Sequence, residues 1–144
     1  MIAVDTNILV YAHRRDSDWH QPAALAIRGL AEGNGAWAIP WPCVHEFLAV
    51  GTHPRIFRTP TSLAAALDQV DAWMEAPTLV RLAEDDDYWA VLRTLIGHAR
   101  VAGPRVHDAR IAALCLAHGV RELWTADRDF SAFPSLRIRN PLVG

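Results

Sequence analysis

The chain has 144 residues, of which 51% are hydrophobic, with a formal net charge of -2 and a pI of about 6.4. This length suffices for one buried core and is too short for two ordinary domains, so residues 1–144 are predicted to form a single domain. The charge excludes a strongly basic nucleic-acid-binding domain. All 14 basic residues are arginine, which excludes any mechanism that requires a lysine.

The cysteines and the N-terminus bear on where the protein works. Cys43 and Cys115 each lie in an apolar segment, so we expect reduced core residues rather than a disulfide or a zinc site. No uncharged stretch approaches membrane-spanning length, and the first residues lack the basic region and apolar core of a signal peptide. We therefore expect a cytoplasmic protein that does not associate with a membrane.

The first predicted elements are a short buried strand, Met1–Val4, and a short apolar helix, Asn7–His13. Asp5 lies between them, so a carboxylate follows the C-terminal end of a strand. In open α/β sheets this edge binds ligands, because the loops form a crevice there and helix N-termini point into it. Asp5 could equally serve as a helix cap, which is a common role for aspartate. Its position alone does not decide between these two roles.

Apolar spacing and capping residues predict the other elements in chain order. The first of these are a helix at 22–32, a strand at 36–39 and a helix from Pro42 to Val50 that carries Glu46. A helix at 62–76, capped by Thr61, and a strand at 78–82 come next. The last are a helix through Trp89, Leu92, Leu95 and Ile96, a helix at 107–118, a strand at 122–124 and an edge strand at 137–139. Helices that alternate with strands favour a three-layer α/β domain with a mainly parallel central sheet, since parallel strands need crossovers of this length.

Two apolar sets have more than one interpretation. The helix at 62–76 carries a stripe that is either core or a partner surface; its members are Leu63, Leu67, Val70 and Met74. The six tryptophans are mostly core by position, and Trp19 and Trp41 are the best placed to stack on a nucleic-acid base.

Four acids have a similar position in the predicted elements. Asp5 and Asp127 follow strands, while Glu46 and Asp108 lie near helix starts that follow loops. Parallel strands bring such ends to one edge of the sheet, so the four side chains can converge. Gathered carboxylates repel one another unless they share a cation or a proton. Because oxygen ligands suit Mg²⁺ or Mn²⁺, we expect a divalent metal there. Alone, Glu46 would fit a solvated helix edge or a structural ion pair.

The segments that carry these acids resemble those of PIN-domain ribonucleases, and closely those of the VapC toxins of bacterial toxin-antitoxin pairs. The matching segments are Val4–Leu9, Val44–Phe47, His107–Ala113 and Leu123–Phe130. The resemblance implies a PIN-like α/β fold, with Asp5, Glu46, Asp108 and Asp127 as catalytic metal ligands, Asp129 as a further metal contact, and Thr6, Asn7 and Thr125 as supporting polar residues. It also implies Mg²⁺, cleavage of RNA phosphodiester bonds by metal-activated water, a homodimer, and a cognate antitoxin as partner.

Asp127 and Asp129 both follow the strand at 122–124, and either could cap the next helix. Asp127 is nearer the strand end and is predicted to face Asp5. Asp129 lies about half a helical turn further on and is predicted to point away or to reach the metal through water.

An acidic site must still hold RNA, and arginine binds phosphate bidentately. The candidate contacts are Arg14, Arg15 and Arg110. Ordinary surface charge explains Arg14 and Arg15 equally well, and it explains Arg55 and Arg58 better.

Three alternatives compete with a toxin. Aspartyl-phosphate phosphatases and receiver domains use strand-end aspartates with Mg²⁺, but both need a lysine that this chain lacks. A non-catalytic module could use the acidic pocket to bind a basic partner. A housekeeping RNA-processing nuclease of the same PIN fold would carry the same acids. Metal-dependent RNA cleavage separates the nucleases from the binding module.

Overall fold

The computed structural model describes all 144 residues and contains one five-stranded sheet. The strand order is β3-β2-β1-β4-β5, and every neighbouring pair is parallel. The strands are β1 (Ile2–Val4), β2 (Trp37–Pro40), β3 (Leu79–Leu82), β4 (Glu122–Trp124) and β5 (Arg137–Arg139). The helices are α1 (Thr6–His13), α2 (His20–Glu32), α3 (Trp41–Gly51), α4 (Leu63–Met74), α5 (Tyr88–Ala99) and α6 (Val106–Ala117), with 3-10 turns η1 (Gly103–Arg105) and η2 (Arg128–Ala132).

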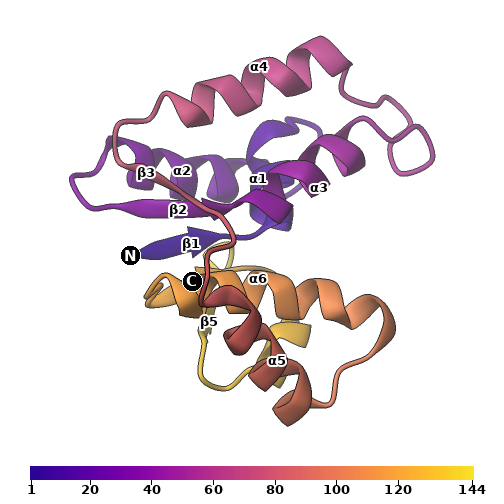
Figure 1. The fold of residues 1–144 in the computed structure, drawn as a ribbon. Helices are drawn as coiled ribbons and strands as arrows, with labels where there is room; N and C mark the ends of the chain where they lie inside the picture. Colours follow the sequence, from indigo (N-terminus) through magenta and orange to yellow (C-terminus); the bar gives the residue numbers. More distant parts are fainter.

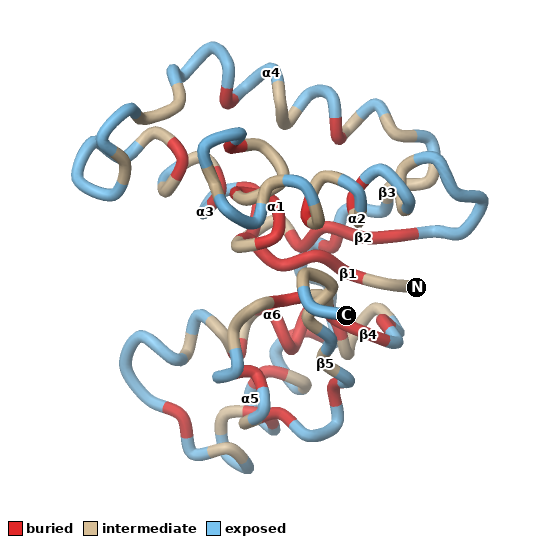
Figure 2. Tube along the Cα trace, turned by 180° about the vertical axis from the view of Figure 1, so that it is seen from behind, coloured by how far each residue is buried: buried red, intermediate tan, exposed pale blue.

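The strand order explains how the helices are layered. The chain moves from β1 to β2 to β3 in one direction, then returns past β1 to β4. Right-handed crossovers then place the helices of the first two connections and those of the return on opposite faces. In Figure 1, α5 and α6 lie together below β1, while α1 and α2 lie above it, and Figure 2 shows the same two layers from behind. The predicted three-layer α/β architecture with a parallel sheet is confirmed.

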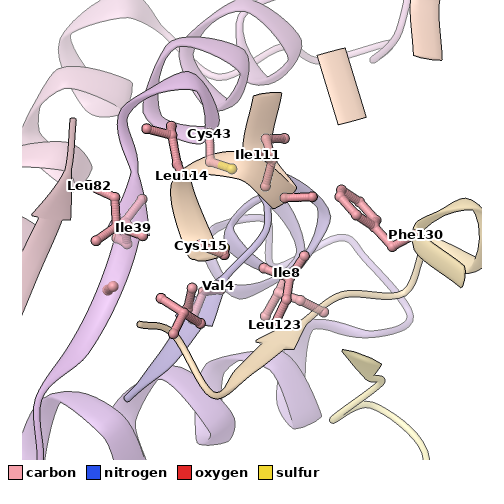
Figure 3. Packing of buried hydrophobic residues seen from close by; sticks show 14 of the residues in the cluster. Val4, Ile8, Ile39, Cys43, Leu82, Ile111, Leu114, Cys115, Leu123 and Phe130 are labelled. Carbon is pink, nitrogen blue, oxygen red and sulfur yellow. The ribbon is translucent and has the colours of Figure 1, made fainter. Parts of the chain in front are cut away.

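The core surrounds the central strand β1. Ala3 and Val4 are fully buried, as are Trp37, Ala38 and Ile39 on the neighbouring strand β2. Figure 3 shows Val4 and Leu123 from adjacent strands close to Cys115 of α6, with Cys43 of α3 near Leu114 and Ile111. Both cysteines are buried and free, as predicted. None of the helices is long and apolar enough to cross a membrane.

Helix α4 lies at the outer margin of the molecule and forms the top of Figures 1 and 2. Only Ala66 and Trp73 of this helix are buried, and Trp73 packs edge-on against Phe47 with ring centroids 4.8 Å apart. Leu63 and Leu67 remain 66% and 46% exposed. Half of the predicted apolar stripe is therefore outside the core, which leaves it available as a partner surface.

Two sequence predictions about single residues are wrong. Trp89 is 64% exposed rather than core, because α5 packs on α6 through Leu92 and Leu95 and turns Trp89 to solvent. The N-cap of α4 is Ser62, whose hydroxyl accepts from the Ala65 N–H at 3.2 Å, and not Thr61.

Arg14 is a structural residue that ties two loops together. Its side chain is only 7% exposed, and its guanidinium lies 3.7 Å from the centroid of the Phe57 ring. It donates to the Thr59 carbonyl at 2.8 Å and to the Thr61 hydroxyl at 3.2 Å. It also pairs with Asp16 at 2.7 Å, and this hydrogen bond lowers the pKa of the exposed Asp16 carboxyl. Because these groups occupy the guanidinium, Arg14 is not available for a phosphate contact, which was one of the two interpretations that the sequence left open.

Replacing Arg14 with alanine should destabilise the fold by about 2 kcal/mol, because it removes a buried cation–π contact and a charged hydrogen bond to Thr59. Arg15 is exposed and provides the matched control, so Arg15→Ala should change stability by less than about 0.5 kcal/mol. Urea unfolding of both variants measures the difference, and equal losses would contradict the structural role of Arg14.

Candidate metal centre

Four acids from four different elements line one cavity of about 270 Å³ at the C-terminal edge of the sheet. Asp5 follows β1, Asp127 follows the adjacent strand β4, Glu46 lies on α3, and Asp108 lies in the first turn of α6. The other lining residues are Thr6, Asn7, Val10, Tyr11, Val50, Phe57 and Ile111. Residues more than 100 positions apart therefore meet because parallel strands end at the same edge.

Asp5 is the deepest acid of the cavity, with only 4% exposure. Its Oδ1 accepts from the Thr6 N–H at 2.8 Å, so Asp5 caps α1 and also lines the cavity. Asp5 therefore combines the two roles that its position suggested, a helix cap and an acid of the ligand-binding edge of the sheet. Its Oδ2 accepts from the Thr125 hydroxyl at 2.8 Å, and the buried Cys43 thiol donates weakly to Oδ1 at 3.6 Å. All of these donors are neutral.

Asn7 and Thr125 connect the two strand ends that carry acids. The Asn7 side-chain amide donates to Asp5 Oδ2 at 3.3 Å and to Thr125 Oγ1 at 3.1 Å, and its carbonyl accepts from the Ala126 N–H at 3.1 Å. Thr125 Oγ1 also accepts from the Asp127 N–H at 3.0 Å. These contacts fix the loop after β4 relative to the start of α1, and they place Asn7 and Thr125 directly beside Asp5 and Asp127.

Asp108, Asp127 and Asp129 form a tighter group, in which one carboxylate oxygen of each lies within 4.8 Å of the other two. Asp127 faces the cavity with Asp5, as predicted. Asp129 does not point away, so the first of the two positions expected for this residue is wrong, and a contact with the metal through water stays a prediction. The chain turns into η2 immediately after Asp127, whose Oδ1 accepts from the Asp129 N–H at 2.8 Å, and this tight turn directs Asp129 back toward Asp108.

Burial and like charge together disfavour the ionised forms of Asp5 and Asp108. Burial raises the pKa of Asp5 to about 6, partly offset by the hydrogen bonds from Thr125 and Thr6, and the Glu46 carboxylate raises it further. Burial also raises the pKa of Asp108, and the neighbouring Asp127 and Asp129 carboxylates add to this rise. Arg105 opposes the shift at Asp108 without coming within ion-pair distance. The cavity therefore has more negative charge than the protein compensates.

The chain offers these acids no cationic partner. None of its 14 arginines lies within ion-pair distance of Asp5, Glu46, Asp108, Asp127 or Asp129. The ligands of an octahedral Mg²⁺ lie about 2.1 Å from the ion, so opposite oxygens are about 4.2 Å apart. Adjacent oxygens of such an ion are only about 3.0 Å apart. The three aspartate oxygens, which lie within 4.8 Å of one another, would therefore have to move closer together to bind one ion. With only oxygen donors present, these residues fit a divalent cation such as Mg²⁺ or Mn²⁺.

Sequence reasoning missed two features of the cavity. Cys43 contacts Asp5, although it was expected only in the core; its spacing of three residues from Glu46 on α3 was the available signal. The apolar wall contains Tyr11 and Phe57, and Phe57 comes from the loop that Arg14 holds in place. No sequence pattern marked Phe57, because its position depends on a contact between distant loops.

The candidate RNA contacts take different positions. Arg15 is exposed in the turn after α1 and does not line the acidic cavity. Arg110, on α6, lines an adjoining groove rather than the cavity itself. Arg55 and Arg58 are exposed on the loop before α4.

The raised pKa of Asp5 predicts a stability that depends on pH in the metal-free protein. The folded pKa lies about 2 units above the ordinary value of 3.8, so ionising Asp5 costs up to about 3 kcal/mol, with the loss developing as the pH rises from about 4 to above 6. The stability of Asp5→Asn relative to the wild type should therefore rise with pH over this range. Urea unfolding in EDTA at several pH values measures it, and a difference that stays constant from pH 4 to pH 7 would contradict the burial of an ionisable Asp5.

Comparison with known proteins places this arrangement in a family. The PIN domain family model matches residues 2–136. VapC ribonuclease Mb2897 of Mycobacterium bovis is 36% identical over 144 residues, covering 100% of this chain and 97% of the relative. Ribonuclease VapC48 of Mycobacterium tuberculosis is 31% identical over 140 residues and covers 97% of both chains.

A solved structure agrees in fold. VapBC2 from Rickettsia felis, crystallised with a DNA fragment from its promoter, superimposes with a TM-score of 0.66 at 22% identity over 97% of this chain and 98% of that chain. At this identity the likeness supports the fold alone, while the sequence matches establish the family. The chain therefore belongs to the PIN-domain family, and within it to the VapC ribonucleases.

Proposed function

We propose that this protein is a Mg²⁺-dependent endoribonuclease that acts as the toxin of a type II toxin-antitoxin pair. The observation that carries the proposal is the cavity of four carboxylates that no arginine neutralises. Such a cavity requires a cation when its acids are ionised, and it opens to solvent where a polymer can enter. Mn²⁺ could take the place of Mg²⁺, because both prefer oxygen ligands.

In this proposal Asp5, Glu46, Asp108 and Asp127 hold the cation, and Asp129 adds a contact from the rim. When bound, a divalent cation activates water for in-line attack on phosphorus and stabilises the developing charge. Asn7 and Thr125 fix the directions of the Asp5 and Asp127 carboxylates through their hydrogen bonds. The apolar wall at Tyr11 and Phe57 limits access of bulk water from one side. No lysine, cysteine or histidine nucleophile is required.

RNA as substrate and an antitoxin as partner rest on the relatives. The two curated relatives are named VapC ribonucleases, and the Rickettsia structure contains a VapB and VapC pair with promoter DNA. A small antitoxin with an apolar helix and a basic residue would complement the exposed leucines of α4 and the acidic cavity. We further propose that the protein works as a homodimer in the cytoplasm.

The VapC relatives favour a toxin over a housekeeping RNA-processing nuclease with the same fold. A non-catalytic module remains the alternative from a different class, and it is separated from both nucleases by metal-dependent RNA cleavage.

Removing single charges from the cavity should abolish cleavage without unfolding the protein. Asp5→Asn, Glu46→Gln and Asp108→Asn each keep the side-chain shape and remove a charge that the cation needs, so RNA cleavage should fall by more than about 100-fold. Asp86→Asn changes an exposed acid outside the cavity and is the matched control. Cleavage of a labelled RNA in Mg²⁺ is measured for each variant, and normal activity of Asp5→Asn would rule out the assigned centre.

Asp127 and Asp129 should differ in the severity of their loss. Asp127 lines the cavity, whereas Asp129 is exposed and joins the group only at its rim. We expect Asp127→Asn to abolish cleavage and metal-induced thermal stabilisation, and Asp129→Asn to weaken both by about tenfold or less. A Mn²⁺ and Mg²⁺ titration of melting temperature and activity compares them. The reverse order of severity would mean that Asp129, and not Asp127, is the principal ligand.

Co-expression tests the antitoxin. The product of the neighbouring reading frame should co-purify with this protein and inhibit its RNA cleavage, and the paired substitutions Leu63→Ser and Leu67→Ser should weaken the complex because both side chains are exposed on α4. Leu25→Ser, at an exposed leucine of α2, is the control. The absence of such a frame, together with no toxicity on expression, would favour the housekeeping role.

A further inference from the structure

We propose that the groove between α3 and α6 binds the RNA strand beside the cleavage position, holding a flanking phosphodiester through Arg110 and His107. The groove has a volume of about 240 Å³ and shares Glu46 and Ile111 with the acidic cavity. Its other lining residues are Pro42, His45, Ala49, His107 and Arg110. This inference rests on the proposed nuclease function, because it describes the path of the same substrate.

Continuity with the acidic cavity selects this groove. Among the five main cavities of the molecule, it is the only one that shares lining residues with the acidic cavity. A polymeric substrate must continue beyond the phosphate that is cleaved. Since the carboxylates repel every phosphate that the cation does not neutralise, the flanking phosphates need a different environment close by. The groove adjoins the cavity and offers such an environment.

The polar groups of the groove suit an anion. Arg110 Nη1 lies 3.3 Å from His107 Nδ1. Arginine can only donate, so His107 accepts at Nδ1 and carries its proton on Nε2. The pair therefore presents N–H donors from both side chains. Arg110 has no carboxylate within ion-pair distance, and its other polar neighbour is the Tyr88 hydroxyl. Glu46 is the one acid that lines the groove, and it is shared with the cavity that the cation would neutralise.

A flat ring beside this pair suits a base. His45 is exposed and lines the groove, and its ring stacks on Trp41 with centroids 6.1 Å apart and planes at 29°. The two residues are four positions apart on α3, so helical geometry fixes the stack. A base next to the bound phosphate can extend this stack, and such contacts tolerate any base. The groove thus combines a phosphate contact with a stacking surface, which is the pattern of single-strand binding.

The test measures RNA binding apart from cleavage. Asp127→Asn is used as the background in EDTA, so that a fluorescein-labelled single-stranded RNA of about 12 nucleotides stays intact. Added to this background, Arg110→Gln should weaken binding about tenfold and reduce the slope of log K against log salt by about 0.7, the value for one phosphate contact on a single strand. His107→Gln should weaken binding with a smaller change of slope than Arg110→Gln, because it removes a donor of the pair and leaves the arginine charge in place. His45→Ala should weaken binding by removing the stacked ring.

Matched controls come from the surface of α5, where Arg93→Gln and His98→Ala change exposed residues outside the groove and should leave binding unchanged. Arg110→Gln with the affinity and salt slope of Arg93→Gln would overturn the phosphate contact, and His45→Ala with the affinity of His98→Ala would overturn the stacking surface. Failure of the wild type to cleave RNA with Mg²⁺ or Mn²⁺ would instead overturn the nuclease. These results are distinct, because the binding assay does not depend on cleavage.

Discussion

The burial of the Asp5 carboxylate beside three other acids is the constraint on which the rest of the site depends. Asp5 is 4% exposed, and every group that donates to it is neutral. A buried charge with no counter-charge is costly, and the usual response is a raised pKa, as this carboxyl shows. The folded protein thus retains an unfavourable arrangement that a bound cation would relieve. This is the physical reason to regard the cavity as a metal centre rather than as a cluster of caps.

The sheet makes this arrangement possible by aligning strand ends. The Asp5 N–H donates to the Trp124 carbonyl at 3.0 Å, and the Thr125 N–H donates to the Arg139 carbonyl at 2.9 Å, so β1, β4 and β5 end in register. That register places the Thr125 hydroxyl 2.8 Å from Asp5 Oδ2. A shift of one residue would turn Thr125 to the other face of the sheet, and the contact between the two strand ends would be lost. The small polar residues after each strand therefore specify the site as much as the acids do.

The sequence predicted the parts of this structure that follow from local pattern and topology. The predicted strand ends, helix starts and parallel strand order were sufficient to predict that Asp5, Glu46, Asp108 and Asp127 lie together. The reason is that the C-terminal ends of parallel strands all lie at one edge of the sheet. Features that depend on a tertiary contact were not predictable. The sequence did not show that the side chain of Arg14 is buried, because its burial depends on contacts with Phe57 and Thr59 in another loop. The sequence left open whether Asp129 points away or reaches the metal through water, because its direction depends on the tight turn at η2.

Helix α6 carries residues of both the acidic cavity and the groove that we propose for the RNA strand. Asp108 lines the acidic cavity, while His107 and Arg110 line the adjoining groove. Successive residues on a helix are about 100° apart, and residues three apart share a face, so His107 and Arg110 point together while Asp108 points aside. This separation keeps the guanidinium from pairing with the acids, which would otherwise neutralise both surfaces. The net charge of -2 therefore does not describe the charge at each position on the surface, because the arginine of the groove lies beside the acidic cavity. In our proposal an RNA strand passes along α6 from the cavity to the groove.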